Sequence, residues 1–253
     1  MKRTAVLSLI VAGLALLSVA STKAFETAQG VTATPITALP FTITTSGNYY
    51  LPANLTTSLP AGAAITIIAS QVVLDLNGRT LSSSAGTSLA NFGVLVANQQ
   101  DVTIQNGDID NFAYGVFLSP NSTDDNVKNV VDNIRFNNDT TAVMSVSGRS
   151  NWVKNCIIDG GDIGIYFFAD LGGSRASNNI IQNQKAQEFP GTGIALISAS
   201  SGGVLFDNNL VSKGSNPVGQ MMSGTDKYRF ESFVGFPAAS PHVGGTNELA
   251  DSL

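Results

Sequence analysis

Two short phrases recur in step along this sequence. The first is a small residue, an aliphatic residue, any residue and a second apolar residue, as in "GVLV" from Gly93 and "GVFL" from Gly115. Successive copies begin 22 to 29 residues apart, at Ala64, Gly93, Gly115, Ala142, Gly164 and Gly193. A pattern repeated at this period indicates a solenoid, in which each repeat buries its apolar face against its neighbours.

The second phrase places an Asn among apolar residues, as in "IQNGDI" and "VDNIRF". Its copies are centred on Asn106, Asn133, Asn155, Asn178 and Asn208, and a looser copy at Asn77 is displaced by about one residue. Asn tolerates the left-handed backbone of a tight corner, and stacked amides can hydrogen-bond as a ladder. We therefore predict an Asn column at one corner of the solenoid.

Each repeat contains three short β-type runs and no amphipathic helical stretch, which predicts an all-β parallel β-helix of about six to seven coils. The aliphatic positions should form two interior columns. They are Ile65, Val94, Val116, Val143, Ile165 and Ile194, then Ile67, Val96, Leu118, Phe167 and Leu196. Ser145 interrupts the second column and should be hydrogen-bonded internally. Cys156 is interpreted as a small buried filler.

The sequence divides into four segments. Residues 1–20 have the form of an export signal, with Lys2 and Arg3 before the apolar run from Ala5 to Ala20 and cleavage after Ala20 or Ala24. That run of 16 residues is shorter than the about 20 needed to span a bilayer, and a retained membrane anchor is the alternative. Residues 25–63 are predicted to be an N-terminal cap, 64–219 the repeats, and 220–253 a last imperfect coil and tail.

Composition excludes several classes of function. Removing Lys2 and Arg3 from 13 basic residues leaves 11 against 18 acidic ones, so nucleic acid is not an expected partner. No later stretch is apolar enough for a membrane span, and a secreted or cell-envelope location is expected. With one Cys and one His, neither an internal disulfide nor a Cys/His zinc site can form.

The chain resembles the secreted bacterial right-handed parallel β-helix proteins of the pectin-lyase-like superfamily. The matching stretches are "PFTITTSGNYYLPANLT", "AITIIASQVVLDLNGRTL" and the repeated glycine and Asn phrases, with weaker matches in "KYRF" and "GGTNEL". This resemblance implies a right-handed solenoid. It implies no single activity, because the superfamily includes pectate lyases, polygalacturonases, epimerases, phage tailspikes and adhesins.

In the enzymes of that superfamily, carboxylates, Arg or Lys and often calcium line the first strand of successive coils. Here the outward positions of the glycine phrase carry no charge, so acid/base catalysis is not expected on this face. These positions are Thr66, Leu95, Phe117, Met144, Tyr166 and Ala195. The paired Asp124 and Asp125 lie in a long turn and are interpreted as solubilising, and His242 is interpreted as a solvated tail residue.

Four of the outward residues, Leu95, Phe117, Met144 and Tyr166, form a predicted apolar stripe, for which three interpretations stay open. The tail, through its aromatic residues, or a long turn can cover it. The stripe can instead contact another protein or a second copy, or stack sugar rings on Phe117 and Tyr166. The aromatic residues available to cover it are Phe230, Phe233 and Phe236. Trp152 should point outward from a different face.

Asp110, Asn137, Asp159 and Glu188 occupy equivalent positions in four successive repeats. Oxygen ligands in such a column suit calcium, and a hydrated acidic edge is the alternative. No other cofactor is expected. The glycosylation pattern occurs at Asn54, Asn121 and Asn138.

The sequence thus predicts a secreted structural or binding module, carbohydrate- or protein-binding, without an evident catalytic site. Its expected partners are a polysaccharide or another cell-surface protein. The first alternative is a lyase or glycoside hydrolase that acts on an extracellular polysaccharide, and the second is an adhesin or assembly subunit. The sequence does not determine the oligomeric state.

Overall fold

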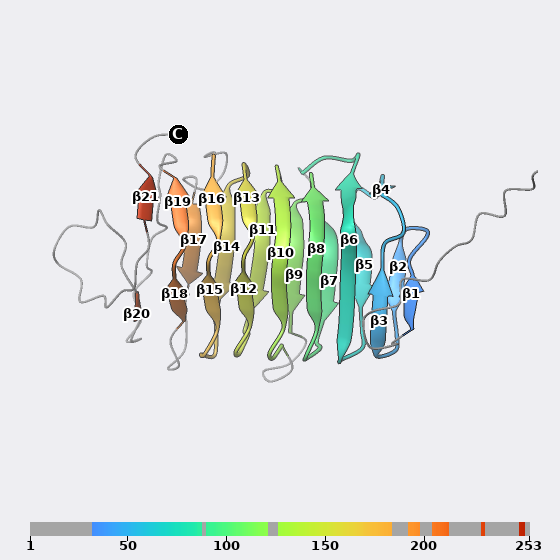
Figure 1. The fold of residues 1–253 in the computed structure, drawn as a ribbon, viewed down its shortest axis with the longest axis horizontal. Helices are drawn as coiled ribbons and strands as arrows, with labels where there is room; N and C mark the ends of the chain where they lie inside the picture. The colour runs from blue at the N-terminus through green and yellow to red at the C-terminus, as the bar shows by residue number, and fades with distance from the viewer. Residues whose placement is uncertain are drawn as a thin grey trace, which may run out of the picture.

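The structure is a computed structural model that describes residues 32–87, 90–120, 126–183, 192–197, 204–212, 229–230 and 248–250. Its strands form two parallel sheets wound into a solenoid (Figure 1). The prediction of an all-β parallel β-helix is confirmed. The solenoid has about five turns, slightly fewer than the six to seven predicted.

The smaller sheet, here sheet B, contains seven strands in the order β17-β14-β11-β9-β7-β5-β2. These strands are β2 (Phe41–Ile43), β5 (Gly62–Ile67), β7 (Asn91–Ala97), β9 (Tyr114–Ser119), β11 (Thr141–Val146), β14 (Ile163–Phe168) and β17 (Thr192–Ile197). Val94 pairs with Val116, and Val116 pairs with Val143. The register therefore follows the spacing of the glycine phrase.

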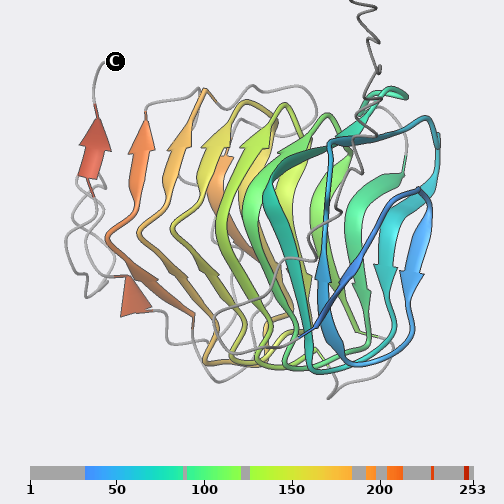
Figure 2. The same ribbon diagram turned by 45° about the vertical axis from the view of Figure 1, so that its right-hand side comes forward.

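The larger sheet, here sheet A, contains 14 strands in two rows that meet at a bend (Figure 2). One row is β1 (Ala33–Pro35), β3 (Gly47–Tyr50), β6 (Val72–Ser83), β8 (Thr103–Asp110), β10 (Val130–Asn137), β12 (Trp152–Lys154), β15 (Arg175–Ser177), β18 (Leu205–Asp207) and β20 (Arg229–Phe230). The other is β4 (Leu55–Thr57), the second halves of β6, β8 and β10, β13 (Ile157–Asp159), β16 (Ile180–Gln182), β19 (Leu210–Ser212) and β21 (Glu248–Ala250). Together with sheet B, the two rows give three strand runs in each coil.

The bend in sheet A lies at the Asn phrase. The five predicted corner residues have φ between 51 and 60°, at Asn106, Asn133, Asn155, Asn178 and Asn208. Asn reaches this left-handed conformation more readily than other residues with a side chain, because its short polar side chain can hydrogen-bond locally. The looser copy at Asn77 lies at an irregularity in the pairing of β6 with β8. Asp75 pairs with Gln105 and Arg79 with Gly107, so β6 has two extra residues at this point.

The segment predicted as a cap forms strands β1 to β4, which pair in parallel with the coils that follow. Ile43 and Leu51 are buried in the same core as the repeats. The strands of the predicted cap therefore continue both sheets and share the core of the repeats. Near the other end, β20 and β21 pair with β18 and β19 and extend sheet A.

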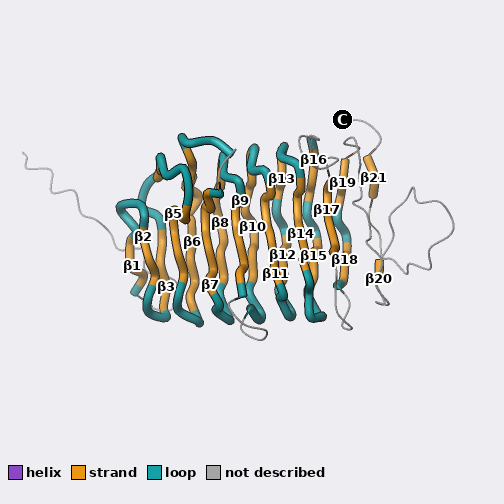
Figure 3. Tube along the Cα trace, turned by 180° about the vertical axis from the view of Figure 1, so that it is seen from behind, coloured by secondary structure: helices purple, strands orange, loops and turns teal. Residues whose placement is uncertain are grey.

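The core lies between the two sheets, while the turns gather in rows outside it (Figure 3). Both predicted aliphatic columns are buried wherever the structure describes their side chains. Ser145 is 1% exposed and accepts a hydrogen bond from Nδ2 of Asn151 at 3.1 Å. Cys156 is also buried, and this burial raises the pKa of its thiol to about 12. Both residues behave as the sequence predicts.

Close contact between coils explains why the first phrase opens with a small residue. A Cβ atom on Gly115 would lie 2.7 Å from the backbone oxygen of Ala142 and 2.7 Å from Cδ1 of Phe136. A Cβ on Gly93 would lie 2.6 Å from the backbone oxygen of Gly115. The glycines at these two positions therefore allow the next coil to approach.

Replacement of Gly115 by Ala should lower the free energy of unfolding by about 1–3 kcal/mol, because the added methyl overpacks a contact between coils. Urea unfolding followed by circular dichroism measures this change. Ser119→Ala on the same strand is the control and should stay within about 0.5 kcal/mol. Equal stabilities of G115A and the parent protein would contradict the packing explanation.

Candidate functional site

Sheet B carries no charge, since none of its seven strands contains Asp, Glu, Lys or Arg. The strand register places the predicted outward residues side by side on successive coils. These residues are Thr66, Leu95, Phe117, Met144 and Tyr166, and all are partly exposed. The predicted stripe is thus a continuous outward column of sheet B.

An aromatic cluster widens the stripe on β7 and β9. The ring of Phe92 stacks on Tyr114 at 5.3 Å and on Phe117 at 5.2 Å between centroids. Phe168, the last residue of β14, is 37% exposed, and Ile68, the residue after β5, is 48% exposed. Because the clustered rings stack on one another, they offer less free ring surface to a sugar, and this weakens the sugar-stacking interpretation at Phe117.

The strands that the structure describes all belong to the two sheets, so no third layer of strands covers sheet B. The tail was one predicted cover. Phe230 instead lies in β20, at the register position next to buried Phe206 in sheet A. This contradicts its predicted role as a cover. Phe233 and Phe236 lie outside the described residues.

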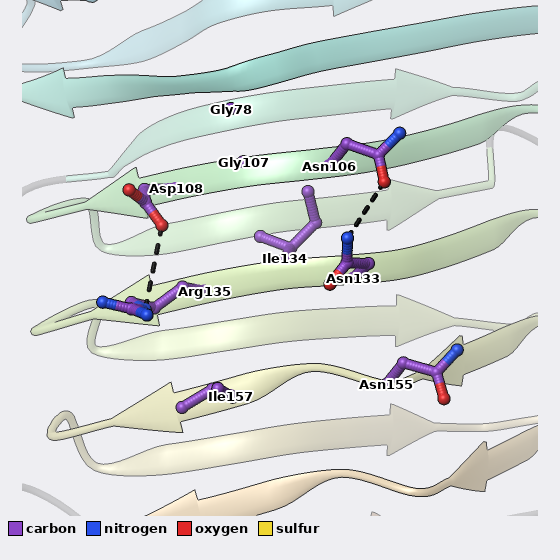
Figure 4. Close-up of a pocket in the computed structure, with 9 residues that line it drawn as sticks. All are labelled: Gly78, Asn106, Gly107, Asp108, Asn133, Ile134, Arg135, Asn155 and Ile157. Carbon is purple, nitrogen blue, oxygen red and sulfur yellow. Dashed lines mark hydrogen bonds and ion pairs between the residues drawn. The ribbon is translucent and has the colours of Figure 1, made fainter.

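A polar groove of about 230 Å³ lies on the outer surface of sheet A, at the bend (Figure 4). Along one side stand the corner amides of three successive coils, and on the other side stand Asp108 and Arg135. The three amides are those of Asn106, Asn133 and Asn155. Side chains alternate between the two faces along each strand, so the residue between Asn133 and Arg135 points inward. This residue, Ile134, is buried, and the surface between the two rows of side chains is left open.

Hydrogen bonds between coils orient these side chains. Nδ2 of Asn133 donates to Oδ1 of Asn106 at 3.0 Å, and Nδ2 of Asn106 donates to Oδ2 of Asp75 at 2.9 Å. Nδ2 of Asn155 donates to Oδ1 of Asp132 at 2.8 Å. The predicted column therefore contains one amide-to-amide bond at this groove, and carboxylates from the preceding coil accept the others.

Two further amide ladders are buried, and neither is among the features predicted from the sequence. In one, Nδ2 of Asn179 donates to Oδ1 of Asn209 at 2.8 Å, while Oδ1 of Asn179 accepts from the backbone of Cys156. The doublets "NN" at 178–179 and 208–209 are the signal that could have revealed it. The other ladder lies at the turn that enters sheet A, where Oδ1 of Asn151 accepts from the backbone N–H of Asn129 and Oδ1 of Asn129 accepts from that of Val102.

Residues 64–232 match the family model described as the right-handed β-helix region. The chain belongs to the right-handed β-helix family. No curated protein and no solved structure matches it. Over the residues described for this β-helix, there is no helix with the length and apolarity that a membrane crossing requires.

The predicted calcium ligands Asp110, Asn137 and Asp159 lie side by side on β8, β10 and β13 of this β-helix. Glu188, the fourth, lies outside the described residues. Asp159 accepts a hydrogen bond from Nδ2 of Asn183 at 2.7 Å. Among the described residues, no three His, Cys, Asp or Glu side chains gather as a metal site would require.

Within the described residues, three carboxyl groups have a raised pKa, in each case mainly because burial disfavours the charged form: Asp110, Asp139 and Asp170. The neighbouring charge of Asp108 raises the pKa of Asp110 further. Asp139 accepts from the backbone N–H of Phe112 through Oδ1, while its Oδ2 has no partner within the described part of the chain. Burial raises the pKa of Asp170 to about 6, and hydrogen bonds from Ser174 and Gly172 oppose this rise.

Trp152 points outward from sheet A, on a different face from the stripe, as predicted. Its ring is covered by cations: Nζ of Lys154 lies 4.3 Å from the ring centroid and Cζ of Arg175 lies 5.3 Å from it. The indole N–H donates to Ser177 at 2.7 Å. Trp152 therefore joins two coils through polar and cation–π contacts.

The proton of Asp170 should make stability depend on pH. Its pKa in the folded protein, about 6, lies above 3.8, so ionisation costs folding free energy. The protein should gain stability as the pH falls from 7 to 4, relative to Asp170→Asn, whose side chain does not ionise. The difference between these pKa values corresponds to roughly 3 kcal/mol. Urea unfolding of both proteins at each pH measures this difference in stability, and parallel pH profiles of the two proteins would contradict the prediction.

Proposed function

We propose that this β-helix is an exported, non-catalytic module that binds a neutral polysaccharide along the corner groove of sheet A. The proposed export depends on residues 1–20, which lie outside the described residues. The observation that carries the binding proposal is the row of oriented amides that faces Asp108 and Arg135 across the groove.

The amides suit hydroxyl-rich ligands. An amide side chain offers both donors and an acceptor oxygen, as does a sugar hydroxyl. The bonds to Asn106 and Asp132 hold the amides of Asn133 and Asn155 in place, so little freedom is lost when a ligand binds. Arg135 adds further donors, and Ile157 supplies an apolar wall for the C–H groups of a sugar ring.

The groove also has a suitable direction and period. It runs from coil to coil, so equivalent groups recur about every 4.8 Å, which is similar to the length of one sugar ring in an extended chain. A linear polymer can therefore present the same hydroxyl groups to successive coils. A single small ligand would use only one or two of these positions.

The surrounding charge favours a neutral polymer over an acidic one. The same sheet carries acidic side chains on successive strands: Asp75, Asp108, Asp110, Asp132 and Asp159. The formal net charge of the chain is −5. Polyuronates would meet repulsion here, and such repulsion weakens as salt screens it.

Removal of the groove amides should weaken binding without unfolding the protein. Glycine adopts positive φ readily, so Asn133→Gly and Asn155→Gly delete an amide but keep the corner backbone. Each should reduce affinity for a neutral polysaccharide at least about tenfold, the effect of losing about 1.4 kcal/mol. Affinity electrophoresis against a panel of neutral and acidic polysaccharides identifies a ligand, and calorimetry then measures the affinity.

Asn178→Gly is the matched control. It makes the same change at the same corner one coil away, at a residue that does not line the groove. It should bind as the parent protein does. Equal losses in all three variants, or no binding to any polymer in the panel, would overturn the proposal.

A glycoside hydrolase is the second candidate, and Asp108 and Asp110 favour it. Both point outward from β8, two residues apart, which places their Cα atoms about 7 Å from each other. Inverting glycosidases hold their two carboxyl groups about 6.5–9.5 Å apart. Burial and the charge of Asp108 raise the pKa of Asp110, as a general acid requires. Against catalysis, Asp110 does not line the groove.

The two candidates differ in turnover. If the module only binds, incubation with the polysaccharides should release no new reducing ends and no unsaturated uronates, with or without calcium. Asp108→Asn and Asp110→Asn should then leave the result unchanged. Turnover that either substitution abolishes would establish the hydrolase and reject the non-catalytic proposal.

A further inference from the structure

We infer that two copies of this β-helix associate through the outward faces of sheet B and form a twofold-symmetric dimer. This inference concerns the opposite sheet from the groove. It does not depend on the proposed polysaccharide binding.

The distribution of charged residues favours sheet B as the dimer interface. The chain is acidic overall, and like net charges oppose the association of two copies. The acidic strand residues described for this chain lie on sheet A, whereas the strands of sheet B contain none. Two copies that meet through sheet B bring together uncharged strands and keep their carboxylates apart.

The composition of the face is that of an interface core. Such cores are depleted in charged residues and enriched in aromatic residues and Met. Sheet B presents the cluster of Phe92, Tyr114 and Phe117, then Met144 and Tyr166 on the following coils. The stacked rings form a preordered surface that loses little entropy on association.

The area is sufficient for a dimer. Six of the seven strands are six or seven residues long and β2 is three, so at a spacing of about 4.8 Å they make a face of about 30 by 20 Å. Two such faces bury about 1,200 Å² in total, which lies at the lower end of the range for specific interfaces. The expected dimer is therefore reversible and depends on concentration.

The order of the strands fits a twofold contact. β9 is the central strand of the seven, with β7 and β11 on its two sides. A twofold axis parallel to β9, midway between the facing sheets B of the two copies, would place Leu95 of each copy opposite Met144 of the other. An interface of this kind uses the same patch on both copies, as closed dimers do.

Sedimentation equilibrium of the purified protein tests the dimer. The protein should show a concentration-dependent shift toward twice the chain mass. Met144→Lys places a charge on both sides of the contact and should raise the dissociation constant at least tenfold. Ile180→Lys is the matched control, because it puts the same charge at an apolar residue that is 39% exposed on sheet A, and it should leave the dimer intact.

A cross-linking measurement keeps the inference testable if Met144→Lys does not fold. The single natural thiol, Cys156, is buried, so an introduced cysteine becomes the accessible one. Met144→Cys should form covalent dimers with a bis-maleimide that spans about 15 Å, since packed sheets lie about 10 Å apart. Ile180→Cys should not form them.

A monomeric parent protein at every concentration, equal weakening by the Met144 and Ile180 substitutions, or equal cross-linking at both positions would overturn the inference. Polysaccharide affinity is measured separately on the same variants. A folded Met144→Lys monomer that still binds polysaccharide would support the dimer and leave the proposed function unaffected. Failure of one proposal can thus be distinguished from failure of the other.

Discussion

The parallel backbone ladder between successive coils is the interaction on which the rest of this structure depends. It holds equivalent residues about 4.8 Å apart and forces every side-chain position to repeat along the axis. One aliphatic position becomes a buried column, and one left-handed corner becomes a row of amides. Val94, Val116 and Val143 pair directly, although 22 residues separate the first two and 27 the last two. The differences in repeat length must therefore be taken up between the paired strands.

The same repetition separates the surface into two chemically different faces. Sheet B is uncharged and apolar on its outward side, while sheet A carries Asp, Lys and Arg side chains that bond from coil to coil. Lys154 bridges to Asp132 at 3.1 Å, and Arg175 bridges to Asp207. One face thus suits contact with another apolar surface, and the other suits a hydrated, hydroxyl-rich ligand. Both proposals follow from this separation and use different sides of the same solenoid.

Buried amides give the solenoid its internal polar connections. Asn129, Asn151 and Asn179 lie in the interior, where an unpaired amide would be costly, and each side-chain amide bonds to a neighbouring coil. Their bonds have defined directions, so they help to specify which coil lies next to which. Aliphatic columns alone would tolerate other registers, because contacts between apolar side chains are not directional.

The sequence by itself determined the all-β solenoid, the register of sheet B, the left-handed corners and the uncharged outward column, because each of these recurs once in every repeat although the repeats differ in length. It also indicated the burial of Ser145 and Cys156, since Ser145 interrupts an aliphatic column and Cys156 directly follows the corner residue Asn155. Only the tertiary structure determined which groups the corner amides hydrogen-bond to. Asn133 bonds to Asn106 but Asn155 bonds to Asp132, and this choice depends on side-chain positions in the neighbouring coil. The tertiary structure likewise placed Phe230 beside Phe206, paired the strands of the predicted cap with the first repeats and opened the groove at the bend. Contacts of this kind between distant segments leave no periodic signal in one chain.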